Sequence, residues 1–145
     1  MCIVFYMSRL NVGVVGYSAQ DFNRGRAEDH LTDAFDKVEE DFSGTPSIVS
    51  GLTDVGVPSL AYREASSRGW HTVGVACIKA ETGKYDCYPV DNKIVREEWE
   101  EWGDESEAFL SRIDVLIRVG GGSQTRDEIG KARQRGIEIL YEGEC

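Results

Sequence analysis

The stretch "IRVGGGSQTRDEIGKA" (residues 117–132) runs from an apolar segment through three glycines into a helical pattern. Glycines at 120–122 lack a Cβ atom, so the chain can turn tightly there and bring its N–H groups close to a ligand. A purely structural interpretation exists beside this one, in which Thr125 caps the next helix and Glu128 completes a capping box. Taken alone, the stretch favours a binding loop and a capped turn about equally.

The rest of the chain repeats this passage from strand to helix. Apolar runs predict strands at 9–17, 47–51, 70–80, 114–120 and 137–143, and apolar residues at helical spacing predict helices at 24–42, 59–69, 96–113 (with a break at Gly103) and 125–136. Strands separated by helices indicate βαβ units and a parallel sheet with both faces covered. We therefore expect one domain over residues 1–145. It should have a Rossmann-like, doubly wound α/β fold with a mainly parallel sheet of about five to six strands.

Two stretches are harder to assign. The segment "KYDCYPVDNKIV" (84–95) fits either a loop or a short extra strand, and the apolar "MCIVFYM" (1–7) fits a strand or an added edge segment. Trp99 and Trp102 stand three residues apart in an acidic stretch that is predicted to be helical. That spacing indicates a buried helix face, covered within this subunit or by a partner.

Composition narrows the possible functions. The 145 residues carry a formal net charge of −10, which argues against a nucleic-acid groove and against docking on an anionic membrane. A small phosphorylated ligand stays possible, because backbone N–H groups hold phosphate without net positive charge. We expect no metal site and no cofactor, and reduced cysteines in a cytoplasmic protein without a signal peptide. The four cysteines, which have no CxxC spacing, are Cys2, Cys77, Cys87 and Cys145.

Three loops follow predicted parallel strands, so we expect them at one edge of the sheet: 16–23, 50–58 and 119–125. Their glycines and hydroxyls suit an anion at the start of a helix. Asp54 fits either a contact to a ribose hydroxyl or a cap on its turn, and Tyr17 fits either stacking on a base or packing. The candidate nucleotide-binding residues are Gly16, Tyr17, Ser18, Ser50, Gly51, Thr53, Asp54, Gly56, Gly120, Gly121, Gly122, Ser123, Gln124 and Thr125.

Two of these loops resemble a known group. Residues 121–128 resemble the G-G-x-G-T-x-x-E motif of the LOG proteins, the lysine decarboxylase-like phosphoribohydrolases. Residues 50–56 resemble the S-G-G-x-x-G segment of the same group and the S-G-x-x-x-G segment of DprA-type DNA-processing proteins. Both groups belong to the SLOG superfamily of Rossmann-like nucleotide-binding domains. The resemblance runs from the first strand to the last helix but leaves 81–104 unmatched.

The resemblance implies a nucleotide held by the glycine loops, a homo-oligomer, and Glu128 as a catalytic carboxylate that faces the ribose. The sequence also departs from the motif. Gly120 replaces its proline and Gln124 one of its glycines, and the Arg-Lys pair of LOG enzymes corresponds to Glu105 and Ser106. Without that pair, a hydrolase loses transition-state stabilisation.

Two functions follow from these observations. The first is a nucleotide-binding sensor or carrier. The second is a nucleoside 5′-monophosphate phosphoribohydrolase that cleaves the N-glycosidic bond with Glu128. DNA binding in the DprA manner conflicts with the net charge of −10.

Overall fold

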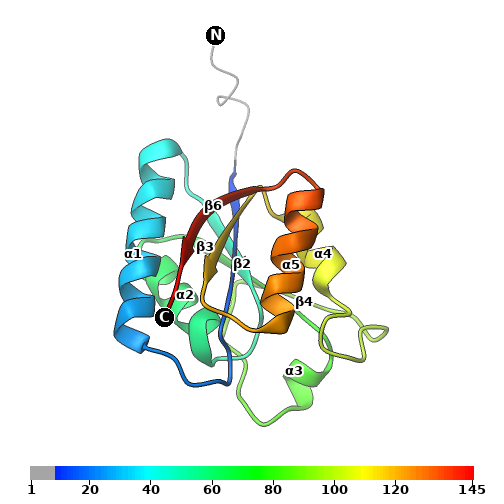
Figure 1. The fold of residues 1–145 in the computed structure, drawn as a ribbon. Helices are drawn as coiled ribbons and strands as arrows, with labels where there is room; N and C mark the ends of the chain where they lie inside the picture. Colours follow the sequence, from blue (N-terminus) through cyan, green and yellow to red (C-terminus); the bar gives the residue numbers. More distant parts are fainter. Residues whose placement is uncertain (1–8) are drawn as a thin grey trace.

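A computed structural model describes residues 9–145, so the strand predicted at 1–7 lies outside the described residues. The described chain forms one parallel sheet in the order β4-β3-β2-β1-β5-β6 (Figure 1). This confirms the predicted Rossmann-like α/β class. The strands are β1 (Asn11–Gly16), β2 (Ser47–Ser50), β3 (His71–Ala76), β4 (Asn92–Val95), β5 (Val115–Val119) and β6 (Glu138–Gly143).

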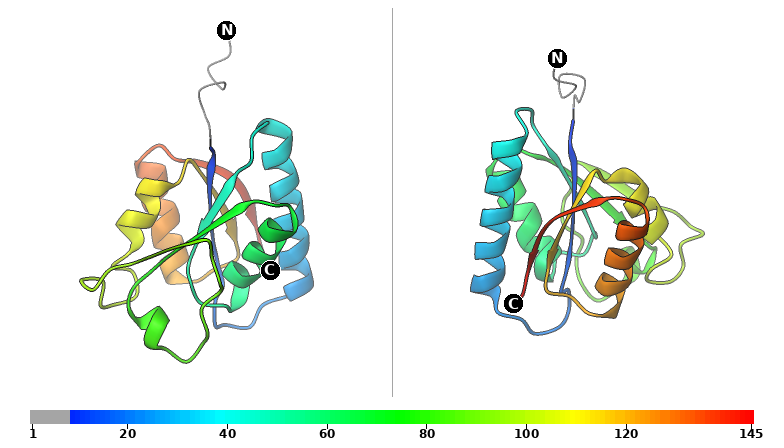
Figure 2. Two further views of the ribbon diagram at one scale, coloured as in Figure 1. Left: turned by 180° about the vertical axis from the view of Figure 1, so that it is seen from behind. Right: turned by 45° about the horizontal axis from the view of Figure 1, so that its top comes forward.

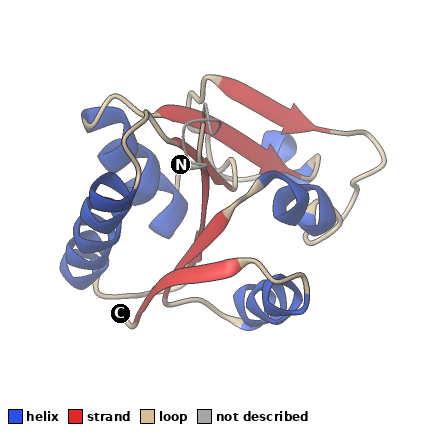
Figure 3. Cartoon of the chain, turned by 90° about the horizontal axis from the view of Figure 1, so that it is seen from above, coloured by secondary structure: helices blue, strands red, loops and turns tan. Residues whose placement is uncertain are grey.

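Helices cover both faces of this sheet, as Figures 2 and 3 show. One face packs against α1 and α2, and the other packs against α4 and α5. The short α3 leads from β3 toward the edge strand β4. The helices are α1 (Arg24–Asp41), α2 (Gly56–Ser67), α3 (Lys79–Thr82), α4 (Ser106–Arg112) and α5 (Ser123–Gln134).

The alternation of side chains along β1 explains the two cores. Val12 and Val14 point into the core beneath α1 and α2, whereas Val15 belongs to the core beneath α4 and α5. Gly13 faces the second core, where an added Cβ would lie 2.8 Å from the Ile113 side chain. Glycine in the middle of β1 therefore lets Ile113 and α4 pack this closely, because a larger residue would have to displace these side chains.

The order of the strands creates a switch point. β1 pairs with β2 on one side and with β5 on the other. The chain leaves β1 for α1 on one face and leaves β5 for α5 on the opposite face. The loops after these two strands therefore diverge, and a crevice opens at the carboxyl edge of the sheet.

The helix predicted at 96–113 is wrong over its first part, because only α4 is helical. Gly103 has φ +103°, which does not continue a helix. Carboxylates satisfy the backbone of the turns instead. Asp104 accepts the N–H groups of Glu100 (3.1 Å) and Glu101 (3.0 Å), and Glu105 accepts that of Gly103 (2.8 Å).

The predicted buried helix face of Trp99 and Trp102 is therefore also wrong. Both residues precede α4; Trp99 is half-buried, and Trp102 is exposed. The remaining differences concern bounds. β3 ends at Ala76, α2 begins at Gly56, and the segment that was open between loop and strand contains β4.

Within residues 9–145, no helix is both long enough and apolar enough to cross a bilayer.

The first core predicts the cost of a cavity. Phe35 is fully buried and stacks on Trp70 with ring centroids 4.5 Å apart. Phe35→Ala should lower the free energy of unfolding by about 3–5 kcal/mol, measured by urea denaturation. Glu40→Ala, an exposed change on the same helix, should alter it by less than about 0.5 kcal/mol. Equal effects of the two substitutions would contradict this assignment of the core.

Candidate functional site

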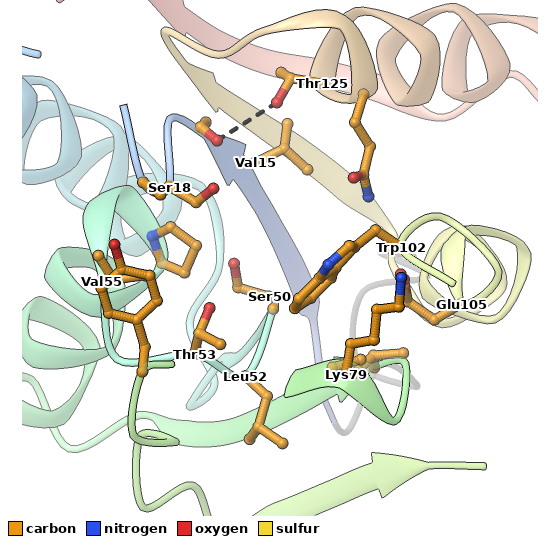
Figure 4. A pocket seen from close by; sticks show the side chains of 18 of the residues that line it. Val15, Ser18, Ser50, Leu52, Thr53, Val55, Lys79, Trp102, Glu105 and Thr125 are labelled. Carbon is orange, nitrogen blue, oxygen red and sulfur yellow. Dashed lines mark hydrogen bonds between the residues drawn. The ribbon is translucent and has the colours of Figure 1, made fainter. Parts of the chain in front are cut away.

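A cleft of about 770 Å³ lies at the carboxyl edge of the sheet, at the switch point between β1 and β5. Its volume falls within the range of small-molecule sites. The loops after β1, β2 and β5 contribute one part of the wall. The start of α5, the α3 segment and the turns before α4 contribute the rest (Figure 4).

Most of the candidate residues from the sequence lie together in this cleft. They come from three separate loops, which the parallel sheet brings to one edge. The candidates that line the cleft are Gly16, Ser18, Ser50, Gly51, Thr53, Gly122, Ser123, Gln124, Thr125 and Glu128.

Tyr17 lines no part of this cleft. Its ring stacks on that of Phe22, with centroids 6.1 Å apart, and packs against the core beneath α1 and α2. A Cβ at Gly120 would lie 2.5 Å from this ring, so Gly120 permits close packing here. Of the two interpretations that the sequence left open, the geometry favours packing over base stacking.

Gly121 and Gly56 shape the loops instead of lining the cleft. Both have positive φ, and a Cβ at Gly56 would lie 2.4 Å from the carbonyl oxygens of Tyr17 and Ser18. The amide N–H of Val57 donates to the Tyr17 carbonyl at 2.7 Å. The loops after β1 and β2 are thus locked together by their backbones.

Asp54 has a structural role in the described chain. Its carboxylate accepts a hydrogen bond from Ser59 Oγ (2.5 Å) and forms an ion pair with Arg63 (3.0 Å). Both partners belong to α2, so Asp54 holds the start of that helix. Asp54 and Gly56 line a neighbouring hollow of about 610 Å³, not the main cleft.

The capping-box interpretation of Thr125 and Glu128 is wrong. α5 begins at Ser123, so Thr125 lies inside its first turn, where Oγ1 donates a long hydrogen bond (3.5 Å) to the Gly16 carbonyl. Glu128 accepts a hydrogen bond from Ser106 Oγ of α4 at 2.9 Å. Its carboxylate is therefore part of the cleft wall, and no side chain caps the N-terminus of α5.

Two carboxylates are buried in this wall, Glu105 and Glu128. Burial raises the pKa of Glu128 to about 7; repulsion from Glu105 adds to the shift, and hydrogen bonds from Ser106 and Gln124 oppose it. Burial also raises the pKa of Glu105, and the hydrogen bond from the Gly103 N–H opposes that rise. Neither carboxylate forms an ion pair within residues 9–145.

Of the two positions that correspond to the LOG Arg-Lys pair, Glu105 lines the cleft, whereas Ser106 does not line it and donates its hydroxyl to Glu128. Arg118, the nearest arginine in sequence to the glycine loop, pairs with Glu142 (2.8 Å) and Glu144 (2.6 Å). It does not line the cleft. No arginine is among the lining residues in the described chain.

Sequence reasoning missed the outer wall, which includes Lys79, Lys84, Tyr85, Trp102 and Glu105. Backbone hydrogen bonds hold the segment after α3 beside the loop after β2, from Asp54 N–H to Asp86 O (2.7 Å) and from Tyr88 N–H to Leu52 O (2.8 Å). The outer wall could have been predicted from the strand order. In a parallel sheet the segment after β3 begins at the carboxyl edge, so the chain between β3 and β4 starts beside the other strand-end loops.

Comparison with known proteins gives neighbours in fold. No protein-family model and no curated protein matches the sequence. Solved structures do match. The molybdenum cofactor carrier protein of Chlamydomonas reinhardtii has a TM-score of 0.73 at 20% identity, over 94% of this chain and 78% of its own.

Two further structures agree with this. The molybdenum cofactor binding protein of the phototrophic bacterium Rippkaea orientalis has a TM-score of 0.73 at 18% identity, over 96% and 79% of the two chains. The structural-genomics target TM1055 has a TM-score of 0.67 at 20% identity, over 88% and 70%. At these identities the likeness shows a shared fold.

The buried Glu128 predicts a pH effect on stability. Its folded pKa of about 7 lies above that of an unfolded glutamate, so its contribution to stability is complete in acid and is lost as the pH rises through 7. Glu128→Gln removes this loss. The free energy of unfolding of the variant relative to wild type should therefore rise between pH 4.5 and 8, by up to about 3 kcal/mol.

Urea denaturation at pH 5 and pH 8 checks this prediction. Glu40→Gln, an exposed neutralisation on α1, controls for the change in net charge. A Glu128→Gln difference that is the same at both pH values would contradict the raised pKa.

Proposed function

We propose that the protein binds a phosphorylated heterocyclic small molecule, a nucleotide or a nucleotide-like cofactor, and acts as its carrier or sensor. The observation that carries the proposal is the convergence of three glycine-containing strand-end loops on one cleft at the switch point. In doubly wound sheets this is where such ligands bind.

The start of α5 supplies the phosphate site in this proposal. Gly122 is the N-cap, and no side chain caps the first-turn N–H groups. By contrast, Asn23 caps α1 by accepting the Arg26 N–H at 2.9 Å. Uncapped N–H groups at the positive end of a helix dipole favour an anion. Ser18, Ser50 and Ser123 add hydroxyls along the same cleft.

The solved neighbours favour the carrier over the enzyme. Two of them are described as a molybdenum cofactor carrier and a molybdenum cofactor binding protein. We extend to this chain the general role that they share, which is to hold a small molecule. The absence of arginine from the described cleft wall agrees with binding without strong transition-state stabilisation.

Hydrolysis of an N-glycosidic bond is the second candidate, and Glu128 favours it. A buried carboxyl group with a pKa of about 7 can hold or donate a proton near neutral pH. Incubation with nucleoside monophosphates, with chromatographic detection of free base, tests this function. Activity that survives Glu128→Gln would rule out the proposed role of this residue.

Binding itself is tested by blocking the cleft. A Cβ at Gly51 would meet no atom within 4 Å, so Gly51→Leu places a side chain in open space at the cleft without strain. At a ligand concentration of about 100 Kd, the free energy of unfolding of the wild type should increase by about 2.7 kcal/mol, which corresponds to roughly 5–10 °C in melting temperature. Gly51→Leu should lose this gain.

The measurement is a thermal-shift series over mononucleotides, dinucleotides and ADP-ribose, with mass spectrometry of any co-purified molecule. Gly130→Leu is the matched control, because Gly130 is exposed on α5 with equally open space and does not line the cleft. Stabilisation of Gly51→Leu equal to that of Gly130→Leu would place the ligand outside this cleft.

A further inference from the structure

Exposed aromatic surface gathers at the cleft. Trp102 is 53% exposed and Tyr85 38%, and these are the exposed large hydrophobic residues of the described chain. Both line the cleft, from segments on either side of β4. Lys84 lies over the Tyr85 ring at 5.5 Å, whereas no aromatic or cationic group of residues 9–145 covers Trp102. An exposed indole in a concave site offers a face on which a planar ring can stack.

The cleft also has two distinct sides. Figure 4 shows Ser18, Thr53 and Val55 on one side, and Trp102, Lys79 and Glu105 on the other. A ligand with its phosphate at the strand-end loops would therefore direct its ring toward Trp102 and the buried carboxylates. Lys79 forms an ion pair with the exposed Glu101, so it leaves Glu105 without a cation.

Neutral groups hold both buried carboxylates. The Gly103 N–H donates to Glu105 Oε1 at 2.8 Å, and Ser106 Oγ donates to Glu128 Oε2 at 2.9 Å. An ionised carboxylate accepts about four hydrogen bonds, so each retains capacity for further donors. Burying such a group without enough donors is costly. The wall is therefore complementary to a ligand edge that presents hydrogen-bond donors.

We propose that this cleft selects a ring whose edge carries two adjacent N–H donors, the amide–amine edge of a 2-amino-4-oxopyrimidine, which guanine and pterins share. The ring stacks on Trp102, and its donor edge faces Glu128, with Glu105 as a second acceptor. This inference rests on the proposed function and assigns its specificity. Adenine places an acceptor beside its amino group, and hypoxanthine lacks the amino group, so neither supplies the donor pair.

The protonation of Glu128 gives a second readout. The groups that face it are Glu105 from the turns before α4, Ser106 from α4, and Gln124 and Lys131 from α5. The donor edge needs the ionised carboxylate, whereas adenine pairs better with a protonated carboxyl group. Affinity for the donor edge should therefore increase from pH 6 to pH 8, and affinity for adenine should not.

Matched ligands test the proposal on the wild-type protein by isothermal titration calorimetry at pH 8. GMP and IMP differ only in the 2-amino group, and pterin and lumazine differ at the same position. GMP should bind about tenfold or more tightly than IMP and AMP, the discrimination that one bidentate contact gives. Pterin should likewise bind more tightly than lumazine.

Variants then assign the residues. Glu128→Gln should weaken GMP binding about tenfold and bring it close to that of IMP. Glu105→Gln should have a smaller effect of the same sign. Trp102→Ala should weaken every ring ligand alike. Glu98→Gln, an exposed change outside the cleft, is the matched control and should leave the GMP to IMP ratio unchanged.

The outcomes separate the inference from the function that it rests on. If the wild type binds GMP and IMP equally, and pterin and lumazine equally, the inference is overturned while the binding function stands. If none of these molecules binds, the inference is overturned as well. The proposed function itself fails only if the thermal-shift series over mononucleotides, dinucleotides and ADP-ribose also shows no stabilisation. If the Glu128→Gln variant does not fold, both conclusions can still be drawn, because they depend on ligand binding by the wild-type protein.

Discussion

The structure depends on one close approach, at the carboxyl end of β1. A Cβ at Gly16 would lie 2.2 Å from the carbonyl oxygen of Val119 and 2.9 Å from Val57 Cβ, so only glycine lets β1, β5 and α2 meet here. The neighbouring contact from Val57 N–H to the Tyr17 carbonyl (2.7 Å) ties the loop after β1 to the start of α2. Thr125 Oγ1 lies 3.5 Å from the Gly16 carbonyl, and this contact ties the start of α5 to the same strand end. The two helix N-termini that border the cleft are thus positioned by one strand end, and a larger residue at 16 would displace both.

This arrangement reconciles an acidic chain with the phosphorylated ligand that we propose. A formal net charge of −10 repels anions at long range, so affinity must come from short-range contacts inside the cleft. Backbone N–H groups and helix dipoles supply such contacts without adding a cation. The two lysines at the rim, Lys79 and Lys84, contribute less than their formal charge indicates, because Lys79 is already paired with Glu101. A negatively charged ligand would therefore enter this cleft more slowly than one steered by an attractive field.

The sequence predicted what depends on local pattern and failed where distant residues decide. Apolar runs with helical spacing between them gave the parallel sheet, and strand-end loops gave one wall of the cleft. Trp102 was misassigned to a buried helix face because its spacing from Trp99 fits a helix. Whether the helix forms was decided by Gly103, with φ +103°, and by the Asp104 carboxylate, which accepts two backbone N–H groups. Thr125 and Glu128 are a second example. Their spacing fits a capping box, but Glu128 instead accepts a hydrogen bond from Ser106, which lies 22 residues away in the chain.

The pair of Glu105 and Glu128 distinguishes binding from catalysis in physical terms. Burial raises the pKa of both carboxylates, and repulsion from Glu105 adds to the rise at Glu128, so ionisation of this wall is costly. In our proposal, a donor edge relieves that cost in the ground state, and the free energy gained appears as affinity. An enzyme instead needs interactions that become stronger only as charge develops in the transition state. The LOG motif supplies that stabilisation through an Arg-Lys pair, whereas this chain has Glu105 and Ser106 at those positions. In our proposal, a wall that has Glu105 in place of a cation recognises N–H donors and not developing negative charge.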